Sequence, residues 1–174
     1  MDNRAMNSRH QYAEMIDNLI GMMEKAGDAV HAAKMRQLYD KMSKNWLAIA
    51  FCGHFSAGKS TLINRLCGND LLPSSPIPTS ANVVMIYDGE PGAVVVHRGN
   101  HDDAGAAVRR EVPLVRLAEY CKDGEQIETV EIRYPLDWLG GRAVLLDTPG
   151  IDSTDDAHRV STESALHLAD VVFY

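Results

Sequence analysis

Residues 47–60 read LAIAFCGHFSAGKS, and this stretch decides the fold of the chain. Its first six residues form an apolar run of the kind that makes a buried parallel strand. The other eight fit the pattern G-x-x-x-x-G-K-[ST] in full. Residues 61–67 then carry apolar side chains at helical spacing and end at Gly68. A strand, a glycine-containing loop and a helix in this order predict a phosphate-binding loop.

Each residue type in this loop has a physical role in binding phosphate. Gly53 and Gly58 let the backbone curl so that successive N–H groups face the phosphates, and the helix that follows adds the positive end of its dipole. We expect Lys59 to place a positive charge on the β- and γ-phosphates, and Ser60 to give a hydroxyl ligand to Mg²⁺. The predicted nucleotide-binding residues of this region are Gly53, His54, Phe55, Ser56, Ala57, Gly58, Lys59, Ser60 and Thr61.

A second motif lies at residues 144–150, which read VLLDTPG. An apolar strand ends in Asp147 and runs into the pattern D-x-x-G. An Asp at the end of such a strand can hold Mg²⁺ through water, and the backbone N–H of Gly150 can meet the γ-phosphate. The pattern is weak by itself, but after a phosphate-binding loop and an apolar strand it is a strong signal.

The loop between the two motifs contains a candidate switch residue. Residues 71–80 read LLPSSPIPTS, and Thr79 follows the last of three prolines. We expect its hydroxyl to bind Mg²⁺ and its backbone to reach the γ-phosphate and the attacking water. The predicted metal ligands are therefore Ser60, Thr79 and Asp147, and the alternative for Thr79 is an ordinary hydrophilic turn.

The segment before residue 46 has a different pattern. Its apolar residues recur at steps of three and four, and Gly27 with Asp28 has the form of a helix end followed by an N-cap. We predict two helices, over 8–26 and 29–44. These helices either pack on their own domain or form part of a helical bundle or neck that is completed by sequence outside this chain.

Composition narrows the class of protein. The 174 residues carry 17 Lys and Arg against 24 Asp and Glu, a net charge of −7, which excludes a generally basic nucleic-acid-binding protein. No apolar run approaches the roughly 18 residues of a transmembrane helix, and the first residues lack the apolar core of a signal peptide. The three cysteines lack metal-ligand spacing and indicate a reduced, cytoplasmic compartment.

The motifs GHFSAGKST, PIPTS and DTPG, in this order, look like the G1, G2 and G3 motifs of a regulatory GTPase. More narrowly, residues 46–174 resemble the dynamin superfamily, in particular the mitofusins and the bacterial dynamin-like proteins. The stretches LLPSSPIPTSANVV, YCKDGEQIETVEI and DTPGIDSTDDAH are most similar to the first GTPase unit of the tandem, two-headed bacterial type.

Two further features agree with this resemblance. The separation of Thr79 from Asp147, 68 residues, is long for a minimal GTPase core, and it contains strand-like segments at 93–97 and 128–134. Dynamin-like GTPases similarly carry an enlarged segment at this place. Gly150 is followed by Ile151, so the glutamine that orients water in Ras-type GTPases is missing.

The resemblance implies an α/β fold of the P-loop NTPase type, with a mostly parallel sheet and helices on both faces. Residues 1–45 would be the N-terminal helical arm, and residues 46–174 would be the N-terminal part of the GTPase domain. We expect the chain to stop inside that domain, because it ends in an apolar strand and no [NT]-K-x-D motif follows. Guanine specificity therefore rests on the resemblance, and an ATPase is the alternative.

The resemblance also implies a GTPase activity. Dynamin-like proteins hydrolyse GTP with a phosphate-loop Ser, a switch Thr and a monovalent cation, Na⁺ or K⁺, assembled when two GTPase domains pair. The catalytic residues would then be Ser56, Lys59 and Thr79, with GTP or GDP and Mg²⁺ bound. The expected partners are a second copy of the protein, the remainder of its own polypeptide and membrane lipids, contacted through regions outside this chain.

The expected role is membrane tethering, fusion or remodelling by a cytoplasmic protein that associates peripherally with membranes. Two other classes stay open from the residues. One is a switch-type regulatory GTPase, for instance of the ribosome-assembly kind, which shares the motifs GKST-L-I-N and DTPG. The other is a nucleotide-binding scaffold without turnover, against which the intact Lys59, Ser60, Thr79 and Asp147 argue.

Overall fold

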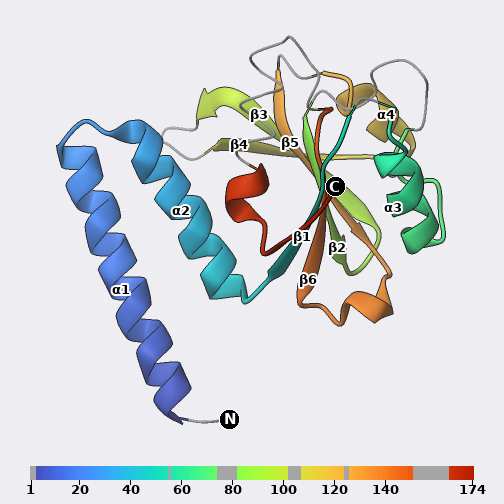
Figure 1. Ribbon diagram of the computed structural model, residues 1–174. Helices are drawn as coiled ribbons and strands as arrows, with labels where there is room; N and C mark the ends of the chain where they lie inside the picture. Colours follow the sequence, from blue (N-terminus) through green and yellow to red (C-terminus); the bar gives the residue numbers. More distant parts are fainter. Residues whose placement is uncertain (1–2, 55, 74–81, 102–106, 124–125, 151–164) are drawn as a thin grey trace. The chain divides into compact units, whose positions relative to one another are not determined.

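The structure, a computed structural model, describes residues 3–54, 56–73, 82–101, 107–123, 126–150 and 165–174 (Figure 1). The chain divides into two compact units, Met1–Trp46 and Leu47–Tyr174, and each is described by itself. Among the described residues, no helix is both long enough and apolar enough to cross a membrane.

The first unit is a pair of helices, α1 (Asn3–Lys25) and α2 (Ala29–Lys44). Gly27 allows the break between them because its φ of 77° lies in the left-handed region. Asp28 is the N-cap of α2, and its side chain accepts a hydrogen bond from the backbone N–H of His31. The predicted break is confirmed, and α2 has its predicted bounds.

The two helices contact each other through a narrow apolar seam. Ile20 of α1 and Ala32 of α2 are buried, and Glu24 forms an ion pair with Arg36. An adjacent stripe of α1 has its large apolar side chains exposed, namely Tyr12, Met15, Leu19 and Met22. The assignment of this unit to a neck or bundle stays a prediction.

The second unit contains a sheet of seven strands among its described residues, in the order β4-β3-β5-β2-β6-β1-β7. The strands in chain order are β1 (Leu47–Phe51), β2 (Val83–Asp88), β3 (Gly92–His101), β4 (Ala107–Val112), β5 (Ile127–Tyr134), β6 (Ala143–Asp147) and β7 (Val171–Phe173). The predicted strands at 47–52, 93–97, 128–134 and 144–147 are confirmed.

The sheet is mixed, which corrects the expectation of a mostly parallel one. Strand β1 pairs in parallel with β6 and β7, and β2 pairs in parallel with β5. However, β2 is antiparallel to β6, and β3 is antiparallel to both β4 and β5. The chain between β2 and β3, and between β3 and β4, is too short for a crossover, so successive strands reverse direction.

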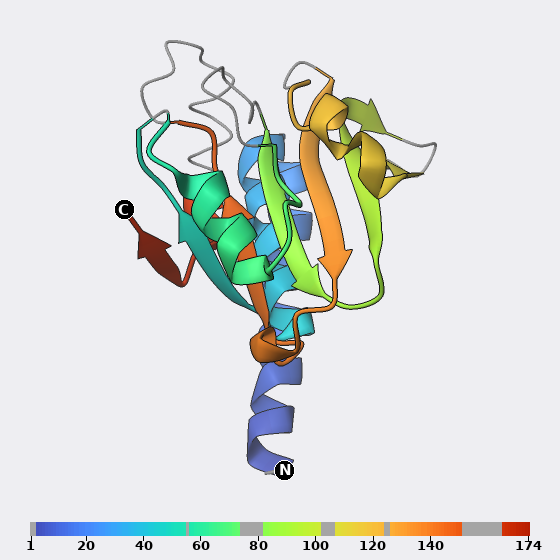
Figure 2. The same cartoon turned by 90° about the vertical axis from the view of Figure 1, so that its right-hand side faces the viewer.

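Helices cover both faces of this sheet. Figure 2 shows α3 (Lys59–Cys67) in front of the β1 and β6 side, and α4 (Leu117–Tyr120) in front of the β5 and β3 side. The 3₁₀ turn η1 (Leu114–Arg116) leads into α4, and η2 (Asp137–Leu139) leads towards β6. A short helical turn at residues 165–168 lies on the opposite side of the sheet from α3 (Figure 1).

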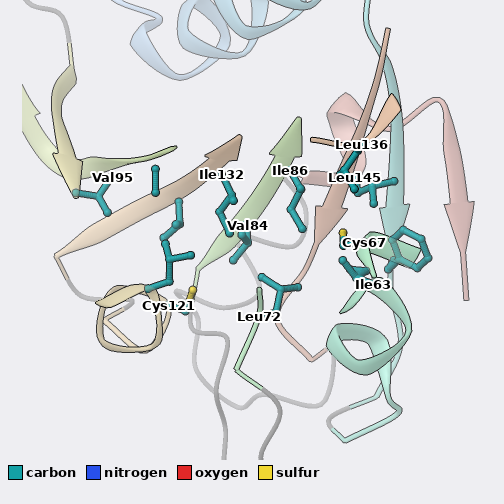
Figure 3. Close-up of a cluster of buried hydrophobic side chains, with 14 of the residues drawn as sticks. Ile63, Cys67, Leu72, Val84, Ile86, Val95, Cys121, Ile132, Leu136 and Leu145 are labelled. Atoms are coloured by element: carbon teal, nitrogen blue, oxygen red, sulfur yellow. The ribbon is translucent and has the colours of Figure 1, made fainter. Parts of the chain in front are cut away.

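The main core lies between the sheet and the helices α3 and α4, which cover one of its faces (Figure 3). Alternate strand residues, such as Val84 and Ile86 of β2, point into it. The helical side contributes Ile63 and Cys67 from α3 and Cys121 just after α4. This packing fixes α3, and therefore the loop before it, against the carboxyl end of β1.

Candidate nucleotide site

The phosphate-binding loop lies between β1 and α3. Gly53 has a φ of 145° and Gly58 a φ of 86°, which are backbone conformations that residues other than glycine rarely adopt. Gly58 is also the N-cap of α3, so the first N–H groups of the helix emerge directly from the loop. Ser56 is a non-glycine residue with a φ of 61°. Strain of this kind at a loop tip is a feature of functional sites.

Lys59 reaches back across the loop. Its Nζ donates to the carbonyl oxygens of Gly53, at 3.1 Å, and of His54, at 3.0 Å. The loop is also closed by a backbone bond from the N–H of Ala57 to the carbonyl of His54. The ammonium group is therefore held at the mouth of the loop, where it would meet the β- and γ-phosphates.

Ser60 and Asp147 meet at the base of this loop. The Ser60 hydroxyl donates to Oδ2 of Asp147 over 2.7 Å, although the two residues lie 87 positions apart. The register of β1 and β6 places Phe51 opposite Asp147, so both strands end at the same edge of the sheet. Asp147 is completely buried.

This pair of oxygen ligands fits Mg²⁺. A hydroxyl and a carboxylate are hard donors, and Mg²⁺ at nucleotide sites is bound by one or two such groups together with the phosphates and water. Among the described residues, no cluster of three or more His, Cys, Asp and Glu could hold a metal ion. The role of Ser60 and Asp147 as metal ligands stays a prediction.

Thr148 is a site residue that the sequence reasoning missed. It is completely buried, and its Oγ1 donates to the carbonyl of Phe51 over 2.9 Å. This bond ties the end of β6 to the end of β1, because Thr148 directly follows Asp147 and Phe51 lies two residues before Gly53. The sequence feature that could have pointed to Thr148 is its position, as a hydroxyl-bearing residue directly after an apolar strand.

His54 and the last residue of the chain are neighbours at the edge of the site. The ring nitrogen Nε2 of His54 lies 3.3 Å from the hydroxyl of Tyr174, and the backbone N–H of Cys52 donates to the carbonyl of Phe173. Both His54 and Tyr174 are exposed. Strand β7 is thereby held beside the start of the loop.

The other predicted site residues stand as follows. Ser56, Ala57 and Thr61 lie in the described loop and first helical turn and are exposed, and Gly150 lies after β6 and is half-buried. Phe55 and Thr79 lie outside the described residues, so the role of Thr79 as a metal ligand and catalytic residue stays a prediction.

Comparison with known proteins shows the family. Residues 49–174 match the model of the dynamin family. Over 147 residues the chain is 47% identical to Dynamin-like protein A of Bacillus subtilis (strain 168), an alignment that covers 84% of this chain and 12% of that protein. The chain belongs to the dynamin family, and the match covers most of its Leu47–Tyr174 unit.

More distant relatives agree with this assignment. Mitofusin-2 of Mus musculus is 29% identical over 133 residues, which cover 72% of this chain and 17% of mitofusin-2. A solved structure, described as an oligomerised bacterial dynamin pair that provides a mechanism for long range sensing and tethering of membranes, superposes with a TM-score of 0.58. Its identity is 20%, and the match covers 95% of this chain and 28% of that one, so it shows the shared fold.

Proposed function

We propose that this chain forms the phosphate-binding part of a dynamin-like GTPase that binds GTP with Mg²⁺ and hydrolyses it to GDP and phosphate. The observation that carries the proposal is the hydrogen bond between Ser60 and Asp147 at the base of an intact phosphate loop. A buried carboxylate next to a helix N-terminus is costly unless a cation or hydrogen-bond donors balance its charge. The base-reading part of the site rests on family membership, from which we infer guanine.

The residues of this chain would act mainly by position and charge. Lys59, held across the loop by two carbonyls, neutralises charge on the β- and γ-phosphates as the bond to the leaving oxygen lengthens. Ser60 and Asp147 would hold Mg²⁺, which would supply Lewis-acid stabilisation of the phosphate charge when bound. Thr79 would hold the attacking water in line with the bond that breaks.

Pairing of two GTPase domains would complete the site. The loop presents His54, Ser56 and Ala57 as exposed residues, with Ser56 in a strained backbone conformation. In this proposal the partner copy covers that surface, and Ser56 with a monovalent cation, Na⁺ or K⁺, stabilises the charge that develops in the transition state. Hydrolysis would then be slow in the monomer and faster in the dimer.

We further propose that pairing is coupled to membrane tethering, fusion or remodelling by a cytoplasmic, peripherally associated protein. The support is membership of a family whose bacterial relatives include one described as sensing and tethering membranes. Lipid contact would come from regions outside this chain. A switch-type regulatory GTPase is the second candidate and shares the same phosphate site.

The test is GTP hydrolysis by the full-length protein, measured against protein concentration, with and without liposomes, and in Na⁺ or K⁺. We expect a specific rate that rises with concentration, and a loss of about 100-fold or more in Lys59→Ala, because a charge in the phosphate site is removed. Lys122→Ala is the matched control, since Lys122 is exposed on the turn after α4.

The results separate the two candidates. A rate that is independent of concentration and of liposomes, but still lost in Lys59→Ala, would favour a switch GTPase that waits for an external activator. Equal rates in Lys59→Ala and Lys122→Ala would overturn the assignment of the phosphate site itself.

A further inference from the structure

Thr148 is one of four polar side chains that are buried in the described part of the second unit. It directly follows Asp147 in the chain and is completely buried. A valine would fill the same space without a polar group, and a hydroxyl in an apolar core costs free energy unless it is hydrogen-bonded. The hydroxyl of Thr148 is therefore explained by the bond that it makes.

This hydroxyl connects the two strands that lead into the phosphate site. Its Oγ1 donates to the carbonyl of Phe51 over 2.9 Å and lies 3.7 Å from Sγ of Cys52. Phe51 and Cys52 are both buried, so the bond lies away from solvent. Phe51 with Asp147 is the last pair in the register of β1 and β6. The Thr148 hydroxyl thus extends the link between these strands by one residue.

Both ends of this bond lie close to groups of the candidate site. On the β6 side, Thr148 is joined by one peptide bond to Asp147, whose Oδ2 accepts the hydroxyl of Ser60 over 2.7 Å. On the β1 side, Phe51 lies two residues before Gly53, where the phosphate loop begins. A shift of about 1 Å between the two strand ends would carry the oxygens of Ser60 and Asp147 beyond hydrogen-bond distance.

We infer that Thr148 is a positioning residue for Asp147. Its hydroxyl holds the Asp147 carboxylate against Ser60 and so sets the affinity of the nucleotide site for Mg²⁺. The inference rests on the proposed function, in which Ser60 and Asp147 hold that ion. Groups that orient metal ligands commonly change metal affinity by about 10- to 100-fold when they are removed. Thr148 acts through Asp147, because its own hydroxyl is directed at the Phe51 carbonyl.

The experiment titrates Mg²⁺ into the full-length protein with a non-hydrolysable GTP analogue and follows nucleotide binding. The Mg²⁺ requirement, which is the concentration at half-maximal effect, is compared between the unmodified protein, Thr148→Val and Thr148→Ser. Valine keeps the shape of threonine but removes the donor, whereas serine keeps the donor. We expect the requirement to rise by about 10-fold or more in Thr148→Val and by less than about threefold in Thr148→Ser.

The affinity for the analogue in EDTA should be the same in all three proteins, because the N–H groups of the loop and Lys59 bind phosphate without the metal. A loss of stability alone would not change the Mg²⁺ requirement of the folded protein. If Thr148→Val does not fold, Thr148→Cys replaces it, because a thiol is only a weak donor.

Two further variants calibrate the result. Ser60→Ala removes a predicted ligand, and combining it with Thr148→Val should raise the Mg²⁺ requirement by less than the product of the two single effects, because both changes act on one interaction. Thr129→Val is the matched control, since it makes the same substitution at a half-buried position of β5, a strand that borders neither β1 nor β6. We expect its Mg²⁺ requirement to be unchanged.

The possible failures are distinguishable. An unchanged Mg²⁺ requirement in Thr148→Val, with a raised one in Ser60→Ala, would overturn the inference and leave the proposed function intact. Equal rises in Thr148→Val and Thr148→Ser would assign the effect to shape, and weaker binding in EDTA would assign it to the domain as a whole. Either result would also overturn the inference. An unchanged requirement in Ser60→Ala would overturn the proposed metal site itself.

Discussion

At the scale of single residues, backbone conformation explains why glycine stands where it does in the phosphate loop. A Cβ on Gly58 would meet no atom within 4 Å, so space alone would allow a side chain there. Its φ of 86° is nevertheless in the left-handed region, where an L-residue is strained. Gly21 in α1 also has open space around it but has no such φ.

This contrast gives a paired prediction. Gly58→Ala should lower the free energy of unfolding by about 1–2 kcal/mol and weaken GDP binding, because the loop must distort. Gly21→Ala should raise the free energy of unfolding by up to about 1 kcal/mol, because alanine is the better helix former. Urea unfolding and GDP titration of the two variants check the pair. Equal and small effects would mean that the loop relaxes freely around Gly58.

At the scale of elements, the start of α2 shows how a single cap responds to pH. The Asp28 carboxylate makes hydrogen bonds with the side chain and with the backbone N–H of His31. These bonds, chiefly the one to the side chain, hold the pKa of the carboxyl below its ordinary value. A lowered native pKa means that the unfolded state binds the proton more readily. The contribution of the cap is therefore present at neutral pH and is lost as the pH falls through the native pKa.

We predict that the first turn of α2 loses protection against amide hydrogen exchange on acidification below about pH 4, measured as the ratio of the intrinsic to the observed exchange rate at each pH. Asp28→Asn keeps a capping acceptor but cannot titrate, so its exchange pattern should show a weaker dependence on pH in this range. Asp28→Ala should show lower protection factors than the unmodified chain at every pH above this range. Identical pH profiles for Asp28→Asn and the unmodified chain would exclude the carboxylate as the titrating group.

The insertion between Thr79 and Asp147 is an element-scale feature whose role only the structure shows. It supplies β3, β4 and β5, which form one side of the sheet beyond β2. Arg109 of β4 reaches over β3 to make two hydrogen bonds with Glu131 of β5, of 2.9 and 2.5 Å. Since Arg109 is half-exposed, this pair contributes little to stability and mainly favours one register of the three strands.

At the scale of the whole molecule, the core keeps the cysteines of the second unit away from solvent. Burial raises the pKa of the Cys67 thiol to about 11. Burial is the main reason that the pKa of the Cys121 thiol is raised to about 12, and the negative charge of Asp147 adds to it. Both groups are therefore thiols at neutral pH, and the thiolate that reacts with alkylating reagents is scarcely populated.

We predict that iodoacetamide at about pH 8 leaves Cys67 and Cys121 unmodified in the native protein and modifies both in denaturant. Ala118→Cys, which places a thiol at an exposed position of α4, is the positive control. Peptide mass spectrometry reads out the sites. Because the native pKa values are raised, the unfolded thiols ionise first as the pH rises above about 9, and stability should fall there. Rapid native labelling of Cys121 would contradict this burial.

The features of this protein that depend on neighbours along the chain could be predicted from its amino-acid sequence. The phosphate loop, the helix break at Gly27 and the strand ending at Asp147 each follow from a contiguous pattern, because backbone conformation and local periodicity are set within a few residues. The family could be recognised for the same reason. The candidate site residues within the loop could be proposed from sequence because one continuous stretch of chain contains them.

The contacts between segments that are distant in the sequence became visible only in the folded chain. The insertion of β5 between β2 and β3, and the mixed direction of the sheet, depend on strand pairing over tens of residues, which no local pattern encodes. The same holds for the bonds of Thr148 to Phe51 and of Asn64 to Leu72, whose partners become neighbours only after the core has packed. Sequence motifs therefore predicted which groups would bind phosphate. Packing brought Ser60 and Asp147 together, because β1, which leads into the loop before Ser60, and β6, which ends at Asp147, end at one edge of the sheet.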